Sequence, residues 1–95
     1  MVIAEEQIGG LTLLQSPEEF QLTRDALALV EFAGVKKGDR VCDLGCGVGN
    51  LLIPLGARAQ ELTLDGVELR ESAAALCRES LSRSGLTGTI VTGDL

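Results

Sequence analysis

Three glycines and two acidic side chains form the part of this sequence best suited to chemistry. The glycines stand at every second position after a short apolar run that carries Asp43, in the stretch VCDLGCGVGN of residues 41–50. Glycine permits positive φ angles and removes the Cβ that would keep a ligand away from the backbone. Amide groups at the start of a following helix can then face that ligand. The pattern predicts a ligand-binding loop, although a tight strand-to-helix turn has the same pattern.

Glu68 is the second acidic side chain of this group. It ends the next apolar segment, nineteen positions after Gly49. In nucleotide-binding sheets a carboxylate about 20 residues beyond the glycine loop accepts hydrogen bonds from ribose hydroxyls. The loop and Glu68 together predict a ligand that contains adenosine. The simpler alternative is that Glu68 is a solvated strand end.

The spacing of the glycines and the position of Asp43 bear on which ligand this is. Dinucleotide-binding loops have the pattern G-x-G-x-x-G, whereas this sequence has Gly45-x-Gly47-x-Gly49. Asp43 would repel a pyrophosphate and attract a ligand that carries ammonium and sulfonium charge. The sequence therefore favours a cationic adenosine derivative over a dinucleotide.

The rest of the chain supplies the elements that would position these residues. We expect, in chain order, an extended segment at 11–15, a turn or early helical turn at 16–22, a helix at about 23–33, a buried strand at 40–44, a helix at 50–59, a strand at 61–69, a helix at 70–85 and a strand at 87–95. Strands that alternate with helices predict an α/β fold with a parallel sheet and flanking helices. We take residues 1–22 as an N-terminal extended segment and turn, and residues 23–95 as a partial sheet domain.

Composition excludes several classes of protein. The chain has 95 residues, of which 45% are hydrophobic and 23% charged, so it is globular and amounts to one small domain or part of one. No apolar run approaches the roughly 18 residues of a membrane span, and the N-terminus lacks the features of a signal peptide. Three cysteines without framework spacing favour a reducing cytoplasm. A formal charge of -6 argues against this segment alone binding a phosphate backbone.

The three cysteines predict packing rather than chemistry. We expect Cys42, on a buried strand, and Cys77, on the apolar side of a helix, to lie in the core. Cys46 stands in the glycine loop, where a small side chain fits. The sequence has no histidine, and Cys42-x-x-x-Cys46 is not a usual zinc spacing, so we expect no metal. No base accompanies any of the thiols, so we expect no catalytic cysteine.

The run D-x-G-x-G-x-G resembles the first motif of class I S-adenosylmethionine-dependent methyltransferases. Glu68 and the Gly93-Asp94-Leu95 end of the last segment match two further motifs of that family in order. The resemblance implies a Rossmann-like sheet and S-adenosylmethionine as cofactor. Asp43 and the loop would hold its methionine part, Glu68 the ribose, Leu69 the adenine face, Asp94 the adenine amino group and the Leu95 backbone the ring edge. The implied cofactor-binding residues are Asp43, Gly45, Cys46, Gly47, Gly49, Glu68, Leu69, Asp94 and Leu95. Asp94 could also be a simple turn former.

The segment before the loop resembles a subgroup of these enzymes. Gln15, Phe20 and Asp25-Ala26-Leu27 match the start of bacterial methyltransferases that modify an adenine amino group in transfer RNA. An ordinary packing helix over the sheet is an equal alternative. That subgroup often carries basic residues near Phe20, whereas this sequence has Glu18 and Glu19.

The resemblance also implies what this chain lacks. A class I sheet has seven strands, of which we expect only the first three here, and the Asn/Asp-Pro-Pro-Tyr/Phe motif that positions an acceptor nitrogen is absent. We therefore expect the cofactor-binding half of a methyltransferase, without catalytic residues, inactive alone and able to act on RNA only with its C-terminal half. A non-catalytic cofactor-binding module and a dinucleotide-dependent oxidoreductase fragment remain alternatives. The strand at 40–44 would be a free edge, through which we expect self-association.

Overall fold

The computed structural model of the chain describes residues 4–16 and 24–94. The elements in chain order are β1 (Ala4–Ile8), β2 (Leu11–Gln15), α1 (Arg24–Ala33), β3 (Arg40–Leu44), α2 (Leu52–Gly56), β4 (Thr63–Glu68), α3 (Glu71–Arg83) and β5 (Thr87–Thr92). Among the helices of these two ranges, none combines the length and the apolar character that crossing a membrane requires.

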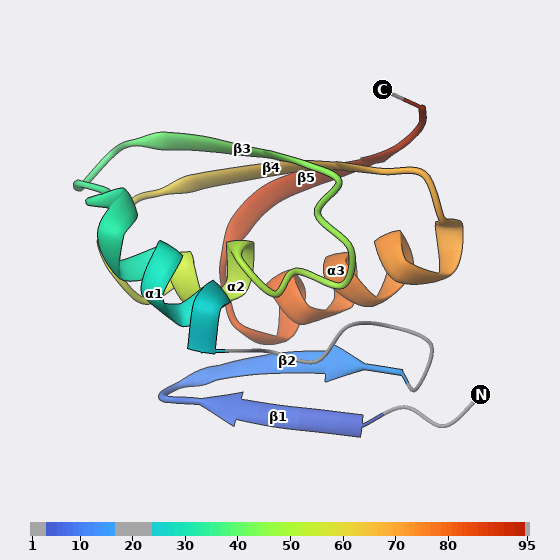
Figure 1. The fold of residues 1–95 in the computed structure, drawn as a ribbon, viewed down its shortest axis with the longest axis horizontal. Helices are drawn as coiled ribbons and strands as arrows, with labels where there is room; N and C mark the ends of the chain where they lie inside the picture. The colour runs from blue at the N-terminus through green and yellow to red at the C-terminus, as the bar shows by residue number, and fades with distance from the viewer. Residues whose placement is uncertain (1–3, 17–23, 95) are drawn as a thin grey trace.

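A three-stranded parallel sheet confirms the α/β class. Its order is β3-β4-β5, so strands that follow one another in the chain lie side by side, as expected (Figure 1). Because all three strands run in the same direction, their carboxyl ends meet at one end of the sheet. The glycine loop after β3, Glu68 at the end of β4 and the residues after β5 therefore share that end.

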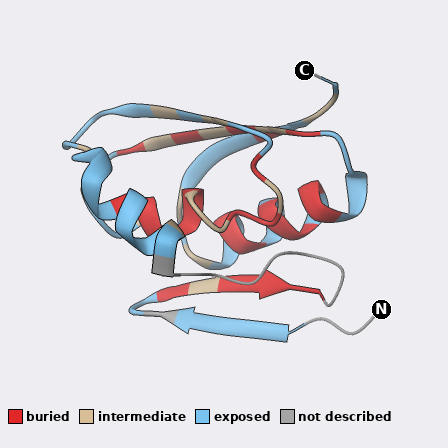
Figure 2. Cartoon of the chain, in the orientation of Figure 1, coloured by how far each residue is buried: buried red, intermediate tan, exposed pale blue. Residues whose placement is uncertain are grey.

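Helices α2 and α3 pack beneath one face of the sheet, and the β1–β2 hairpin lies beneath α3 (Figure 1). The main core fills the space between the sheet and these helices, and it includes Leu64 of β4, Ile90 of β5 and Cys77 of α3 (Figure 2). Leu13 of β2 is fully buried against the other side of α3. The prediction that Cys77 lies in the core is confirmed. Helix α3 thus contacts apolar residues on both sides.

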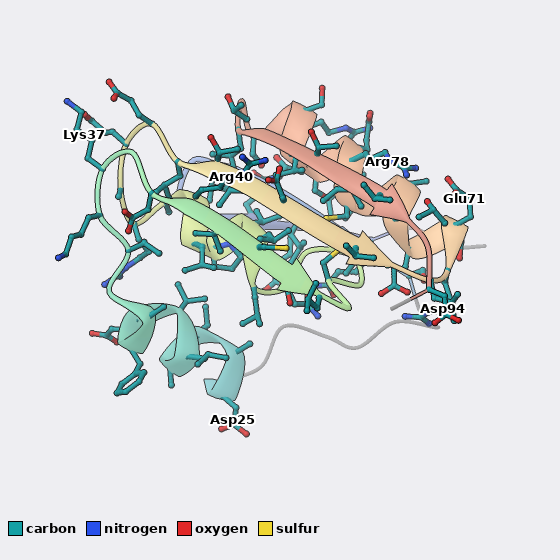
Figure 3. The ribbon with its side chains drawn as sticks, turned by 90° about the horizontal axis from the view of Figure 1, so that it is seen from above. Asp25, Lys37, Arg40, Glu71, Arg78 and Asp94 are labelled. Atoms are coloured by element: carbon teal, nitrogen blue, oxygen red, sulfur yellow. The ribbon has the colours of Figure 1, made fainter. Side chains whose placement is uncertain are left out.

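The prediction of a buried strand at 40–44 is wrong in one respect. Strand β3 has the expected bounds, but its residues alternate between exposed and half-buried. It is an edge strand, and no described helix covers the outer face of the sheet (Figures 1 and 3). Cys42 points to that open face and is exposed, so its predicted place in the core is wrong as well. Self-association through the β3 edge stays a prediction.

Helix α1 covers less of the protein than its apolar stripe indicates. Among its side chains at 25–33, Val30 alone is buried, and Phe32 is 88% exposed. Three predictions lie outside the described residues: the start of this helix at Thr23, most of the turn at 16–22 and the boundary between residues 22 and 23.

Helix α2 is shorter than the predicted helix at 50–59. It spans Leu52–Gly56, and its end tightens because Ala57 N–H donates to Pro54 and Arg58 N–H donates to Leu55, in each case three residues back. Pro54 stands early enough in the helix to be accommodated. The strands and the helix at 61–69, 70–85 and 87–95 lie where predicted, with shorter ends.

The sequence did not predict strand β1. It pairs antiparallel with β2 from Ala4 opposite Gln15 to Ile8 opposite Leu11. The other edge of β2 meets α3, where Ser80 Oγ accepts a 2.8 Å hydrogen bond from Leu14 N–H. Ser84 Oγ accepts from Thr12 N–H and donates to Thr12 O. Two serine hydroxyls thus replace a neighbouring strand for the outer backbone groups of β2.

We predict that Ser80→Ala lowers the free energy of unfolding by about 1 to 3 kcal/mol, because it leaves the buried Leu14 N–H without an acceptor. Urea unfolding followed by circular dichroism measures the change. Ser82→Ala is the matched control, because Ser82 is exposed on the same helix, and its effect should stay within about 0.5 kcal/mol. Equal effects of the two substitutions would contradict the role of Ser80 in docking the hairpin.

Candidate functional site

The glycine loop leaves β3 in a conformation that only glycine adopts readily. Gly45, Gly47 and Gly49 have φ angles of 82°, 58° and 102°. Gly45 N–H and Cys46 N–H both donate to the Val67 carbonyl of β4, at 2.7 and 3.0 Å. The pairing of β3 with β4 therefore continues into the loop and turns it toward the end of β4.

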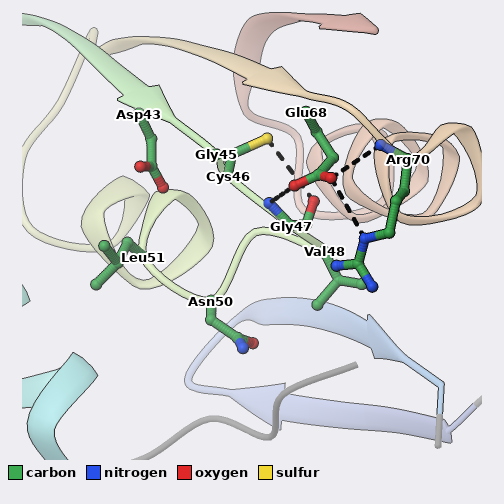
Figure 4. A pocket seen from close by; sticks show the side chains of 9 residues that line it. All are labelled: Asp43, Gly45, Cys46, Gly47, Val48, Asn50, Leu51, Glu68 and Arg70. Atoms are coloured by element: carbon green, nitrogen blue, oxygen red, sulfur yellow. Dashed lines mark hydrogen bonds and ion pairs between the residues drawn. The ribbon is translucent and has the colours of Figure 1, made fainter. Parts of the chain in front are cut away.

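The Glu68 carboxylate ties this loop to the start of α3. Its Oε1 accepts a 2.8 Å hydrogen bond from Gly47 N–H, and its Oε2 accepts a 2.9 Å bond from Arg70 N–H (Figure 4). The guanidinium of Arg70 adds a longer contact of 3.5 Å from Nε to Oε2. Glu68 is 7% exposed. Both oxygens of this buried acid thus accept a backbone hydrogen bond, and the acid holds three segments together.

A cavity of about 270 Å³ opens beside this carboxylate. The structure brings five of the predicted site residues to its wall: Asp43, Gly45, Cys46, Gly47 and Glu68. Four further lining residues were not predicted: Val48, Asn50, Leu51 and Arg70 (Figure 4). Arg70 could have been predicted from its position in the sequence, because it precedes a helix and stands two residues after Glu68. Asn50 and Leu51 lie between the loop and α2.

Three other predicted residues, Gly49, Leu69 and Asp94, lie outside this wall. A Cβ on Gly49 would lie 3.0 Å from Ile53 Cγ1 and 3.1 Å from Cys77 Sγ, so this glycine lets the loop pack on the core. Leu69 is 66% exposed, and Asp94 is exposed beyond the end of β5. Leu95 lies outside the described residues. Whether Leu69 and Asp94 contact a bound ligand stays a prediction.

The two carboxylates of the cavity titrate in opposite directions. Burial, and then the negative charge of Glu68, raise the pKa of Asp43 above its usual value. The hydrogen bond from Arg70 N–H, together with that from Gly47 N–H, holds the pKa of Glu68 below its usual range. Because burial raises the pKa of Asp43, keeping this carboxylate charged costs free energy. A positive group beside Asp43 would recover that cost.

Cys46 packs beneath the loop. Its Sγ lies 2.7 Å from the position that a Cβ on Gly66 would occupy, so the glycine of β4 makes room for the thiol. A hydrogen bond with Cys46, and burial, raise the pKa of Cys77 far above its usual range. These thiols fill space between the loop, the sheet and α3.

Four amide donors of the loop are already in use. The amides of Gly45, Cys46, Gly47 and Gly49 all donate within the protein. Phosphate-binding loops instead present a row of free N–H groups to their ligand. This cavity offers two carboxylates and one arginine, which suits a ligand with positive charge and hydroxyl donors. No three His, Cys, Asp or Glu side chains gather as a potential metal site within residues 4–16 and 24–94.

Solved structures share this fold. The tRNA (uracil-54, C5)-methyltransferase of Pyrococcus abyssi, in complex with S-adenosyl-L-homocysteine, aligns with a TM-score of 0.76 and 21% identity over 97% of this chain and 24% of that protein. TYW2 of M. jannaschii, in complex with AdoMet, aligns with a TM-score of 0.77 and 16% identity over 97% of this chain and 43% of that protein. These likenesses show a common fold. The cofactor expected from the sequence is the ligand in the M. jannaschii structure, and S-adenosyl-L-homocysteine is the ligand in the P. abyssi structure.

Curated relatives and a family model identify the family of this chain. The 23S rRNA (uracil(1939)-C(5))-methyltransferase RlmD of Klebsiella pneumoniae is 37% identical over an alignment of 87 residues that covers 82% of this chain and 19% of that protein. The same enzyme of Salmonella typhi is 36% identical over 83 residues. The chain spans about a fifth of the length of these relatives. The sequence model of the methyltransferase small domain matches residues 21–95. The chain belongs to the methyltransferase small domain family.

Proposed function

We propose that this chain binds S-adenosylmethionine and is the cofactor-binding part of an RNA methyltransferase. The carrying observation is the cavity, in which Asp43 and Glu68 face a loop whose amides are already satisfied. The cofactor brings a sulfonium, an ammonium group and two ribose hydroxyls. Asp43 attracts the positive charge, and Glu68 accepts from the hydroxyls with the lone pairs that its two backbone bonds leave.

The dinucleotide alternative has less support. A pyrophosphate needs free N–H donors and positive potential, whereas the amides of Gly45, Cys46 and Gly47 are engaged and two carboxylates line the cavity. The non-catalytic module differs from the leading proposal only in lacking a methyl acceptor, so a measurement of cofactor binding does not separate the two. A measurement of methyl transfer separates them.

For the acceptor we propose C5 of a uracil in RNA. This proposal is supported by the curated relatives at 36 and 37% identity, which are named as uracil-C5 methyltransferases of 23S rRNA. An adenine amino group, which the sequence suggested, finds no support in these names. Nucleoside analysis of RNA methylated with labelled S-adenosylmethionine separates the two acceptors, with 5-methyluridine as the expected product and N6-methyladenosine as the contrary one.

Within this function, the chain's own share is positioning. Methyl transfer is an in-line attack on the sulfonium carbon, so holding the cofactor in one orientation lowers the barrier. Uracil C5 must also be activated for methyl transfer. The thiol of Cys46 packs against Gly66 under the loop, so we do not assign it this role, and we assign no activating group to the cavity wall. A cytoplasmic location belongs to the proposal, and the three free thiols suit a reducing compartment.

We predict that the purified chain binds S-adenosylhomocysteine in isothermal titration calorimetry and does not bind NAD. The two ligands share adenosine, so the comparison isolates the methionine part from the pyrophosphate. Binding of NAD alone would support the oxidoreductase alternative. Binding of neither ligand by the folded chain would contradict the proposed function.

We predict that Asp43→Asn weakens binding of S-adenosylmethionine at least about fivefold and that of S-adenosylhomocysteine less, because only the first carries the sulfonium charge. Calorimetry with both ligands measures the difference. In the wild type, binding of S-adenosylmethionine should weaken as the pH falls through the raised pKa of Asp43, because protonation removes its charge.

The stability of the free protein should respond in the opposite sense. Because the folded pKa of Asp43 is raised, its ionisation costs stability as the pH rises from its usual value through the raised one. Asp43→Asn should therefore unfold at a higher temperature than the wild type at pH 7. Equal weakening for the two ligands and an unchanged melting temperature would contradict a charge role for Asp43.

A further inference from the structure

A cluster of polar side chains, outside the cavity, joins α3 to the end of β5. Its members are Glu71, Arg78 and Thr92. The guanidinium of Arg78 donates from Nη1 to Glu71 Oε1 and from Nη2 to Thr92 Oγ1, both at 2.8 Å. The hydroxyl of Thr92 donates to Glu71 Oε2 at 2.6 Å. These hydrogen bonds, first that from Thr92 and then that from Arg78, lower the pKa of Glu71. The three side chains form a closed ring of bonds.

Arg78 also binds the backbone of β5. Its Nε and Nη2 donate to the Ile90 carbonyl at 3.1 and 3.0 Å. Strand β5 lies at an edge of the sheet, where β4 is its partner on one side only. The planar fork of the guanidinium therefore satisfies an edge carbonyl and fixes the strand to α3 at the same time. A lysine could not make this pair of bonds in one geometry.

Glu71, Arg78 and Thr92 together clamp the end of β5 to α3, and Thr92 stands two residues before Asp94. After Thr92, Gly93 N–H donates to the Glu68 carbonyl at 3.0 Å, so the chain is still paired with β4. Asp94 follows as an exposed carboxylate, and Figure 3 shows it beyond the end of β5, near the start of α3. Ligands of open parallel sheets bind outside the carboxyl ends of the strands. The clamp thus fixes the last paired residues before a carboxylate at the ligand-binding end.

We propose that Arg78, with Glu71 and Thr92, positions Asp94 to read the base of the bound nucleoside. This inference rests on the proposed function, because it requires an adenosine ligand beside Glu68. A carboxylate only accepts hydrogen bonds, so it selects a base with an exocyclic amino donor over one with a carbonyl at that place. Arg78 is a positioning residue in this account, since it acts through the β5 backbone and touches no ligand.

A purely structural clamp would affect stability and all ligands alike. The test therefore compares two ligands that differ at the base alone, S-adenosylhomocysteine and S-inosylhomocysteine, in which a carbonyl replaces the amino group. The variant is Arg78→Met, which keeps the length of the side chain and removes its donors. The matched control is Arg83→Met, because Arg83 lies on the same helix with similar exposure of 46% against 42%, and its described bonds go to the side chains of Glu5 and Glu79.

We predict that the wild type and Arg83→Met bind S-adenosylhomocysteine at least about tenfold more tightly than S-inosylhomocysteine, because the second ligand lacks the donor. In Arg78→Met this preference should fall below about threefold, mainly through weaker binding of the adenosine ligand. Amide hydrogen exchange of the free protein gives a readout without ligand. The Gly93 amide should exchange faster in Arg78→Met than in the wild type, with unchanged exchange in β3.

The outcomes separate this inference from the proposed function. If Arg78→Met is folded and keeps the wild-type preference and Gly93 protection, the clamp does not position Asp94 and the inference is overturned. If the wild type binds neither ligand, the proposed function and this inference fall together. Should Arg78→Met not fold, Thr92→Val decides, because it removes the two bonds that Thr92 makes in the ring and leaves the bonds of Arg78 to Glu71 and Ile90. A preserved preference in Thr92→Val would then overturn the inference, and a reduced one would support it.

Discussion

The structure depends on the two backbone hydrogen bonds that the Glu68 carboxylate accepts. The two carboxylate oxygens accept from Gly47 N–H of the glycine loop and from Arg70 N–H at the start of α3. A buried carboxylate is costly unless such donors satisfy it. The bonds to Glu68 therefore fix the loop, the end of β4 and the start of α3 relative to one another, and the cavity exists because these three segments converge. The same acid fixes the loop and, in the proposed function, supplies acceptors to the ribose hydroxyls.

This constraint also decides what the site can bind. Because four loop amides donate to Val67, Glu68 and Cys46, these four are not available to a phosphate. Two carboxylates line the cavity, and burial, followed by the negative charge of Glu68, raises the pKa of Asp43. A cationic ligand would offset the cost of this negative charge. The electrostatics of the cavity therefore support the cofactor proposed above.

The parts that the sequence predicted are those that local pattern determines. Strand β3, the positive φ angles of the loop and the place of Glu68 follow from apolar runs and glycines within about thirty residues. Strand β1 could not be predicted, because AEEQI has no apolar alternation and becomes a strand by pairing with β2. Cys42 was misplaced because its burial depends on what covers the sheet. The bonds of Arg78 to β5 join residues that only the fold brings together.

Binding of S-adenosylhomocysteine to Glu68→Gln, measured by titration calorimetry against the wild type, tests the central claim most directly. An amide of the same shape replaces one acceptor with a donor, which must then face Gly47 N–H or Arg70 N–H and cannot accept from a ribose hydroxyl. The account predicts binding at least about tenfold weaker, because a charge-assisted hydrogen bond is lost and the loop is loosened. Wild-type affinity in a variant with an unchanged circular dichroism spectrum would contradict it.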